Sequence, residues 1–319
     1  MSITGIVNNN EIPEIGEFLK SSMPERSDFK SYRYNKAFLT TREVIAPYNL
    51  ELPAYASTVG TAFDYYARFE IARQLKDEIN KKESLDIVAK YGINFLYYIG
   101  LSEEAKYAKD KYDKHMENIE DYIDGYDMPD SWVESACCFF ATLEHFVRCG
   151  KISRDTLHID DVSKSISNDL KNLVRGFRKE FIGKYVNQDS MVVFNPTFRC
   201  FNGGDADIFI DGTLYDFKTS KSLGYKGSEV AQVWAYFLLH EIDKENIEID
   251  LFSRSEIKRI GIYKARCADV DYVDIDKRRH CTSENAKKLE RLLKIYKVYK
   301  GYNHKKDEEV FRNVRKTSD

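Results

Sequence analysis

The chain has 319 residues, 43% of them hydrophobic and 32% charged, with a formal net charge of −3 at neutral pH. This composition predicts a soluble globular protein of one elaborated domain or two closely packed ones, and it does not by itself indicate nucleic-acid binding. No apolar run is long enough to cross a bilayer, and the N-terminus lacks the basic and apolar segments of a signal peptide. We therefore expect a cytoplasmic protein that does not bind membranes.

The six cysteines form no C-x-x-C pair, and their spacings suit neither a zinc site nor an iron–sulfur cluster. We therefore expect no iron–sulfur cluster. Cys137 and Cys138 stand in an apolar helical run, and we interpret them as reduced core residues.

The first half of the chain is predicted to be largely helical. Residues 1–59 are expected to form an irregular or partly helical extension, because four prolines divide them into short elements. A helix is predicted from Gly60 to Arg73, with Phe63, Ala67 and Ile71 at helical spacing on its apolar face.

A large helical insertion is predicted next, at about residues 74–187. Isolated His145 and His158 fall within it, and a lone helical histidine is more often a packed or exposed residue than a metal ligand. Four stretches of the insertion have helical periodicity, with Ser or Asp near their starts: 84–98, 102–122, 131–149 and 160–182.

A β-hairpin is predicted after a first strand at Ser190–Phe194. Asp211-Gly212 is a two-residue turn signal, because a type I′ turn needs positive φ at both central positions. That turn fixes the register of the pairs, which are Ile210 with Thr213, Phe209 with Leu214, Ile208 with Tyr215, Asp207 with Asp216, and Asp205 with Lys218.

Four charged side chains emerge on one face of this hairpin: Asp205, Asp207, Asp216 and Lys218. Two carboxylates about 4 Å apart repel each other by about 1 kcal/mol in water and by about 4 kcal/mol at an effective dielectric constant of 20. Asp also has a low propensity for β-strands. A divalent cation between Asp207 and Asp216 explains this placement. A solvated outer face that happens to carry acids explains it less well.

The chain downstream of the hairpin continues with a helix from Ser228, on which Gln232 and Tyr236 share a face. A late strand is predicted at Ile257–Tyr263. The segment from Lys287 to Lys300 is basic, which is typical both of a phosphate-binding surface and of a solvated helix face.

Three motifs in this order resemble the PD-(D/E)XK nuclease superfamily, and more closely its RecB-type branch. They are Gly204-x-x-Asp207, Asp216-Phe217-Lys218-Thr219 and Gln232-x-x-x-Tyr236. The resemblance implies an α/β, restriction-endonuclease-like core with a mixed central sheet flanked by helices, at residues 60–266. The helical insertion would interrupt this core, and a basic helical C-terminal segment would follow it at 267–319.

The resemblance also implies roles for the motif residues. Asp207, Asp216 and the backbone carbonyl of Phe217 are the expected ligands of one or two Mg²⁺ or Mn²⁺ ions. Lys218 is expected to orient or deprotonate the attacking water and to stabilise the phosphorane. Gln232 and Tyr236 are expected beside the active site, holding the lysine or contacting the nucleic-acid backbone.

One departure from the branch concerns its first helix, which reads Gly-Thr-x-apolar-His with the histidine as a ligand. Here Asp64 stands at the histidine position. Asp is a good ligand for a hard cation, so Asp64 is either the third metal ligand or a surface residue with that ligand absent. Glu70 lies about 240° around the helix from Asp64 and is less suited to the same ion.

Asp205 is either the ion-pair partner of Lys218 or an outer ligand.

The sequence therefore predicts a metal-dependent nuclease, with DNA as the expected substrate and with Lys221, Lys226 and Gln232 in contact with nucleic acid. One alternative is a catalytically inactive nuclease-fold module that binds nucleic acid within a larger complex, motivated by Asp64 and by the acidic net charge. Another is a scaffold whose acids are surface decoration. The chain has no helicase motif, so a motor, if the activity needs one, is expected on a separate partner chain.

Overall fold

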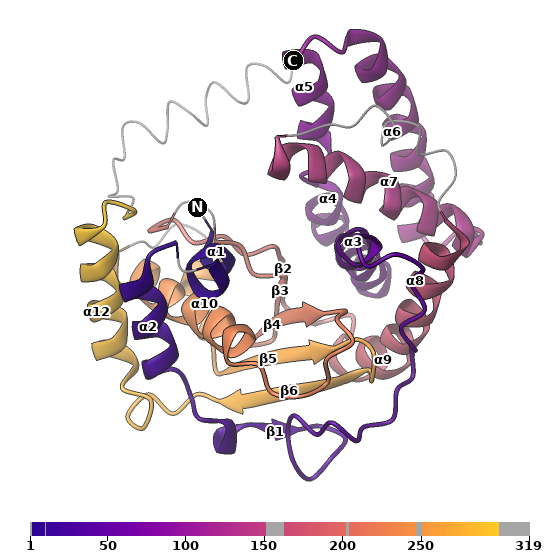
Figure 1. Ribbon diagram of the computed structural model, residues 1–319. Helices are drawn as coiled ribbons and strands as arrows, with labels where there is room; N and C mark the ends of the chain where they lie inside the picture. Colours follow the sequence, from indigo (N-terminus) through magenta and orange to yellow (C-terminus); the bar gives the residue numbers. More distant parts are fainter. Residues whose placement is uncertain (1, 10, 151–162, 202–203, 247–250, 300–319) are drawn as a thin grey trace.

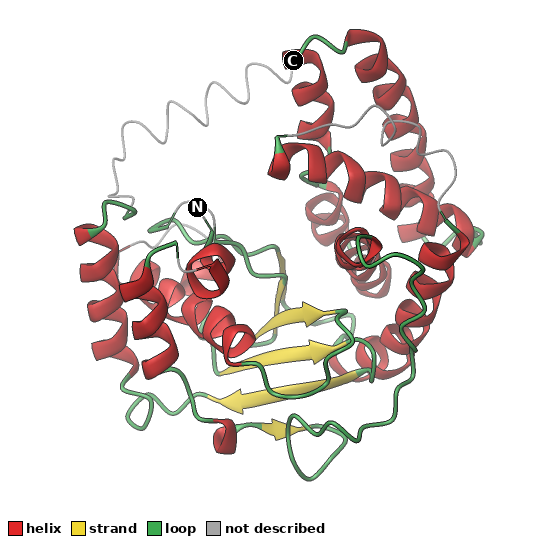
Figure 2. Cartoon of the chain, viewed as in Figure 1, coloured by secondary structure: helices red, strands yellow, loops and turns green. Residues whose placement is uncertain are grey.

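The computed structural model describes residues 2–9, 11–150, 163–201, 204–246 and 251–299, which form an α/β fold (Figure 1 and Figure 2). Six strands in these ranges form one mixed sheet in the order β1-β6-β5-β4-β3-β2. β4 and β5 are parallel, and the other neighbouring pairs are antiparallel. The strands are β1 (Lys30–Ser31), β2 (Val192–Phe194), β3 (Ile208–Ile210), β4 (Thr213–Lys218), β5 (Arg259–Lys264) and β6 (Asp269–Asp274).

Both faces of the sheet are covered by helices, as predicted, because successive side chains of each central strand alternate between two apolar layers. Ile208 and Phe217 pack into the layer formed with α3 (Tyr55–Leu75) and α8 (Lys164–Phe177). Phe209 and Leu214 point the other way, into the layer under α10 (Gly227–Asn246). Figure 1 shows α3 and α10 on opposite sides of the strands.

The described N-terminal residues belong to the second of these layers. α1 (Ile3–Asn9) and α2 (Pro13–Ser22) pack against α10, and α12 (Thr282–Ile295) lies beside them (Figure 1). A 3₁₀ turn at Arg26–Asp28 leads into β1, which pairs with β6. The N-terminal segment, for which the sequence predicts only short broken elements, thus contributes two helices and an edge strand to the fold.

In the helical insertion, α6 (Ser102–Ile123) and α7 (Asp130–Cys149) pack on the outer side of α3 (Figure 1). α5 (Lys90–Tyr98) packs on α6 and α7, while α4 (Glu78–Leu85) contacts both α3 and β2. The predicted single helix at 84–98 is wrong, because α4 and α5 are separate. The chain turns at Asp86, whose backbone carbonyl accepts a hydrogen bond from Arg68 Nη1 at 3.2 Å instead of continuing a helix. The helices predicted at 102–122 and 131–149 are confirmed. The four helices of this group are α4 (Glu78–Leu85), α5 (Lys90–Tyr98), α6 (Ser102–Ile123) and α7 (Asp130–Cys149).

The fourth predicted helix of the insertion is α8, which begins at Lys164. Its predicted start at 160 lies outside the described residues, as does His158. α8 runs into a π-helical turn at Arg178–Ile182 and then into the short α9 (Gly183–Tyr185), which leads toward β2. No helix in the described part of the chain is long and apolar enough to cross a membrane.

The elements after the hairpin lie close to their predicted positions. α10 begins at Gly227, and β5 covers most of the strand predicted at Ile257–Tyr263. α11 (Leu251–Arg254) precedes β5. β6 was not predicted and lies beyond residue 266, so the sheet extends past the predicted end of the core. α12 carries most of the basic segment predicted from Lys287, and Lys300 lies outside the described residues.

Candidate functional site

The hairpin that organises the site has the predicted turn and, from Ile208 to Tyr215, the predicted register. Asp211 and Gly212 have φ values of 47° and 86°, so both central positions adopt the left-handed conformation that a type I′ turn requires. Ile210 pairs with Thr213 and Ile208 pairs with Tyr215. The local turn signal was therefore sufficient to place the two strands that carry the acidic motifs.

The two motif acids meet just beyond the paired part of the hairpin. Asp207 immediately precedes β3, and its Oδ2 accepts a hydrogen bond from the backbone N–H of Phe217 on β4. Asp216 stands next to Phe217 and is buried. Burial, and then the charge of Asp216, raise the pKa of Asp207 to about 7. The pKa of Asp216 is also raised by burial, against the lowering effect of Lys218.

Lys218 joins the acids to the motif helix. Its Nζ is 2.7 Å from Oδ2 of Asp216 and donates a hydrogen bond to Oε1 of Gln232 at 3.2 Å. Nε2 of Gln232 donates to the hydroxyl of Tyr236 at 2.9 Å. Although burial lowers the pKa of Lys218, Asp216 and Asp207 raise it overall, so the amine is held charged. The structure brings these five motif residues together in one network.

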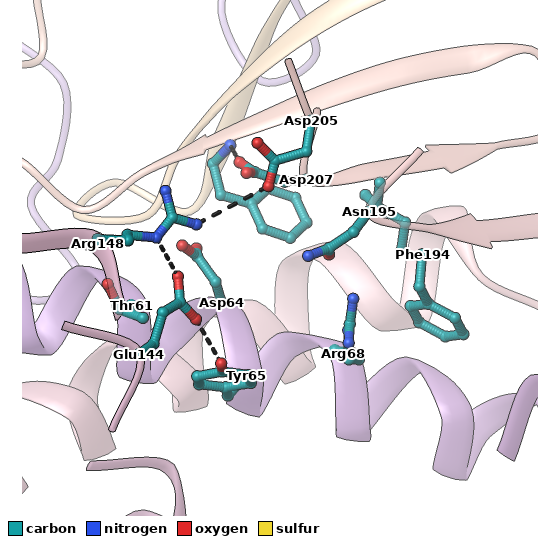
Figure 3. Close-up of a pocket in the computed structure, with 12 residues that line it drawn as sticks. Thr61, Asp64, Tyr65, Arg68, Glu144, Arg148, Phe194, Asn195, Asp205 and Asp207 are labelled. Atoms are coloured by element: carbon teal, nitrogen blue, oxygen red, sulfur yellow. Dashed lines mark hydrogen bonds and ion pairs between the residues drawn. The ribbon is translucent and has the colours of Figure 1, made fainter. Parts of the chain in front are cut away.

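Asp64 reaches the same place from the other layer of the fold. It stands on α3, is half-buried, and points toward Asp207 (Figure 3). Burial, and then the charge of Asp207, raise its pKa well above the usual value. Asp64 and Asp207 line a cavity of about 50 Å³. A buried water occupies about 10–15 Å³ by this measure, so the cavity has room for an ion with a few waters and not for a nucleotide.

Glu70 lies elsewhere on the same helix, as the helical geometry predicts. Its Oε1 is 2.6 Å from Nε of Arg178 and also accepts a hydrogen bond from the hydroxyl of Tyr122. These contacts tie α3 to α6 and to the end of α8, so Glu70 is part of the packing of the helices.

Asp205 does not lie opposite Lys218, so that part of the predicted register is wrong. The β3–β4 pairing ends at Ile208, and at Asp205 the chain instead forms a bridge with Thr197. One carboxylate oxygen of Asp205 is 3.8 Å from Nη2 of Arg148 (Figure 3). The ion-pair partner of Lys218 is Asp216.

Residues of the helical insertion contribute to the site, and the sequence analysis missed them. Glu144 of α7 is buried, and it accepts hydrogen bonds from the hydroxyl of Tyr65 and, at 2.5 Å, from Nε of Arg148. Arg148 therefore bridges α7 and Asp205 across the mouth of the cavity (Figure 3). Nothing in the α7 sequence marks these two residues, because their role depends on how α7 packs on α3.

Asn195 is a second residue that sequence reasoning did not single out. Its φ is 42°, a left-handed conformation that Asn tolerates better than most residues. Its backbone N–H donates to the carbonyl oxygen of Asp207 at 3.1 Å, and its side chain lines the cavity. The turn after β2 therefore helps to fix the backbone of Asp207.

The two flanking lysines lie apart from the cavity lining. Nζ of Lys221 lies 5.6 Å from the centre of the Tyr48 ring. Nζ of Lys226 is 3.2 Å from Oε1 of Glu229, a residue that is also paired with Lys264. Lys226 is thus engaged in an ion pair, and Lys221 is the more exposed of the two.

The donor chemistry of the site suits a hard cation. Asp64, Asp207 and Asp216 lie near Lys218, and burial is the largest cause that raises the pKa of each of these three carboxyl groups. Within the described ranges, however, no three His, Cys, Asp or Glu side chains are arranged as a ready metal cage. Mg²⁺ is commonly held by one or two carboxylates together with waters and substrate phosphates, so the pair of Asp207 and Asp216 fits this ion.

Comparisons with known proteins do not identify the chain. No family model matches it, and the searches of curated proteins and of solved structures found no match. The functional argument therefore rests on the three motifs and on the geometry of the site.

Proposed function

We propose that this protein is a Mg²⁺- or Mn²⁺-dependent nuclease of the PD-(D/E)XK type that hydrolyses phosphodiester bonds, with DNA as its expected substrate. The observation that carries the proposal is the meeting of Asp207, Asp216 and Lys218 at the end of one hairpin. Two carboxylates that share a buried site repel each other unless a proton or a cation lies between them. A divalent ion supplies that charge and, when bound, activates water and stabilises the leaving oxygen.

Asp207, Asp216 and the Phe217 carbonyl would hold the ion. The N–H of Phe217 points toward Asp207. The N–H and C=O of one strand residue point to the same side of the strand, so this carbonyl faces Asp207 as well. The carbonyl of Lys218 faces the other way, since it accepts a hydrogen bond from the N–H of Ala265 at 2.9 Å. Asp64 would complete the site from α3.

Lys218 would act as a charged group. Its raised pKa keeps the ammonium protonated beside the acids, so it orients water and stabilises a phosphoryl oxygen rather than removing a proton. Gln232 holds the amine from α10, and Tyr236 in turn fixes the amide of Gln232. Both residues are therefore positioning residues in this proposal.

A binding module without turnover is the second candidate, and Asp64 at the position of the expected histidine and the acidic net charge favour it. Such a module would use the same site to hold nucleic acid without cutting it. Cleavage assays separate the two candidates.

The test compares purified wild-type protein with Asp216→Ala and Lys218→Ala on single- and double-stranded DNA and RNA, with Mg²⁺ or Mn²⁺. Asp189→Ala is the control, because Asp189 is an exposed acid in the loop before β2. We expect cleavage by the wild type and the control, and a loss of about a thousandfold or more in both site variants, which corresponds to about 4 kcal/mol of transition-state stabilisation.

Three results would contradict the nuclease proposal. Cleavage that survives in both site variants would come from another site or from a contaminant. Binding of nucleic acid without cleavage by any form would establish the binding module. If the protein neither binds nor cleaves nucleic acid, the acids have no role in nucleic-acid chemistry.

A further inference from the structure

Arg68 differs from the other deeply buried arginines of the described chain. Arg42, Arg68 and Arg266 are each at most 7% exposed. Arg42 is paired with Asp271, and Arg266 is paired with Asp169 through two contacts of 2.6 and 2.7 Å. A buried charge is costly unless a partner compensates it, and both of these guanidinium groups have a carboxylate partner.

Arg68 has no carboxylate within ion-pair distance in the part of the chain that the structure describes. Its Nη1 donates to the carbonyl oxygen of Asp86 at 3.2 Å, and its guanidinium lies 5.6 Å from the centre of the Phe194 ring. A guanidinium carries five N–H donors. Arg68 therefore keeps most of its hydrogen-bonding capacity in a largely buried position, and burial lowers its pKa.

The position of Arg68 links the metal-site cavity to a larger groove. Arg68, Phe194, Asn195 and Asp205 line both the cavity of about 50 Å³ and an adjoining groove of about 660 Å³. The groove also includes residues of α4 and of the edge strand β2. Figure 3 shows Arg68 between Asp64 on one side and Phe194 and Asn195 on the other. A ligand in the groove would thus pass Arg68 before it reached Asp207.

Arg68 is the sole Lys or Arg among the described residues that line the groove. Four acids also line it: local contacts engage Asp77, Asp86 and Asp205, and the fourth, Glu83, is exposed. Asp77 accepts a hydrogen bond from the N–H of Asn80 at the start of α4, Asp86 pairs with Lys90, and Asp205 pairs with Arg148.

The rest of the groove offers apolar surface. Ile79, Tyr91 and Leu251 line it and are 73%, 48% and 60% exposed. Exposed apolar side chains gathered at a groove indicate a binding surface, and an aromatic ring such as that of Tyr91 can stack on any nucleobase. The groove thus combines one cation with surface suited to bases.

We propose that this groove holds a single-stranded nucleic-acid segment, and that Arg68 binds the phosphate of a nucleotide beside the one at the metal site. The inference rests on the proposed function and adds a substrate class to it. The groove lies within the range of about 300–1,000 Å³ typical of small-ligand sites, so it takes one or two nucleotides and not a duplex. The planar donor fork of Arg suits a phosphate.

The test measures binding of a fluorescently labelled oligothymidylate of about 12 nucleotides, with Ca²⁺ in place of Mg²⁺, by fluorescence anisotropy. The variants are Arg68→Gln and the matched control Arg73→Gln. Arg73 stands on the same helix, donates to the carbonyl of Tyr122 at 2.8 Å and lies over the Tyr122 ring, but it lines neither the cavity nor the groove. Both variants therefore lose backbone hydrogen bonding and one aromatic contact, and Arg73→Gln also loses a second, longer hydrogen bond to the carbonyl of Tyr126 at 3.4 Å.

We expect Arg68→Gln to weaken binding of the oligonucleotide by about tenfold or more, since the substitution removes charge-assisted hydrogen bonds to the phosphate. Arg73→Gln should bind as the wild type does. With Mg²⁺, Arg68→Gln should raise KM for the single strand more than it lowers kcat. A blunt duplex should be affected less.

The outcomes separate this inference from the proposed function. If the wild type cleaves the oligonucleotide and Arg68→Gln matches Arg73→Gln, the Arg68 inference is overturned and the nuclease proposal stands. If the wild type binds without cleaving and Arg68→Gln loses binding, the groove is supported and the nuclease proposal falls. If the wild type neither binds nor cleaves, both fall. Should Arg68→Gln not fold, Arg68→Met replaces it, because Met keeps a long side chain without charge or donors, and unchanged binding by a folded Met variant would overturn the inference.

Discussion

Two buried clusters of charge lie at different places on the same sheet, and they are compensated differently. In the first, Arg42 is 3.4 Å from Asp269 and is hydrogen-bonded to Asp271, while Arg266 holds both oxygens of Asp169. This cluster ties β6 and the β5–β6 turn to the N-terminal loop and to α8. Each carboxylate in it faces a guanidinium, so it has the character of a closed structural network.

The second cluster, at the end of the hairpin, has acids in excess. Asp64, Asp207 and Asp216 lie around Lys218, which is ion-paired with Asp216, and burial raises the pKa of each of these acids, as it does for Asp271 in the first cluster. Buried acids that lack a guanidinium partner are a setting in which a bound cation would be stabilising, and this is the physical basis of the proposed metal site. The contrast between the clusters is the strongest physical argument for function in this chain.

The largest expected effect is a difference in the free energy of unfolding between the variants Asp169→Asn and Asp216→Asn. Removal of one partner from a buried ion pair costs about 3–5 kcal/mol, so Asp169→Asn should lower the free energy of unfolding by that amount. Asp216→Asn should change it by less than about 1 kcal/mol in the absence of metal, because the lost attraction to Lys218 is offset by relief of repulsion from Asp207. Urea unfolding followed by circular dichroism measures both values.

Equal destabilisation by the two substitutions would contradict the proposed difference between the two clusters. The hairpin acids would then be a structural ion-pair network like the first cluster. The double variant Asp169→Leu/Arg266→Met serves as a control. Replacement of a whole buried pair by apolar residues is often neutral, so this variant should recover much of the stability that Asp169→Asn loses.

A smaller effect is expected from Gln232→Ala. The substitution removes the acceptor that holds the Lys218 amine and the donor to Tyr236. Loss of an outer contact of this kind typically costs about 10–100-fold in activity or metal affinity. Steady-state kinetics should show the loss in kcat rather than in KM, and Gln232→Glu should recover part of it, because a carboxylate also accepts from the amine. A Gln232→Ala variant with wild-type kcat would contradict the proposed role of Gln232 in positioning Lys218.

A further expected effect is a pH dependence of stability in metal-free protein. Burial and Asp216 raise the pKa of Asp207 to about 7, whereas an Asp in an unfolded chain has a pKa of about 3.9. Between about pH 4 and 7 the folded chain therefore holds a proton that the unfolded chain has released, so this group makes the folded state less stable as the pH rises through that window.

Asp207→Asn isolates this contribution. In EDTA, the free energy of unfolding of the variant minus that of the wild type should increase from about pH 4 to about pH 7 and then level off. A difference that stays constant across the window would show that Asp207 ionises normally, and the case for uncompensated charge at the hairpin would weaken.

The parts of the fold that were predictable from sequence are those fixed by local signals. Asp211-Gly212 determined the turn, the turn determined the register, and the register brought Asp207 and Asp216 together. The spacing of Gln232 and Tyr236 likewise placed both on one face of α10. These inferences needed only neighbours within a few residues along the chain.

The parts that were not predictable depend on contacts between distant segments. Glu144 and Arg148 reach the cavity only because α7 packs on α3, and the break in the predicted helix 84–98 lies at Asp86, whose carbonyl accepts a hydrogen bond from Arg68 on α3. Asp205 left the predicted register because the chain before β3 pairs with Thr197. Helical periodicity and turn chemistry carry no information about such contacts.

The most direct test of a cation between Asp207 and Asp216 is calorimetric titration of Mn²⁺ into the wild-type protein and into the double variant Asp207→Asn/Asp216→Asn. We predict that the wild type binds one or two ions and that the double variant, although folded, binds none at the same concentrations. Binding of equal strength in both proteins, or no binding by the wild type, would contradict the assignment of these carboxylates as a metal site.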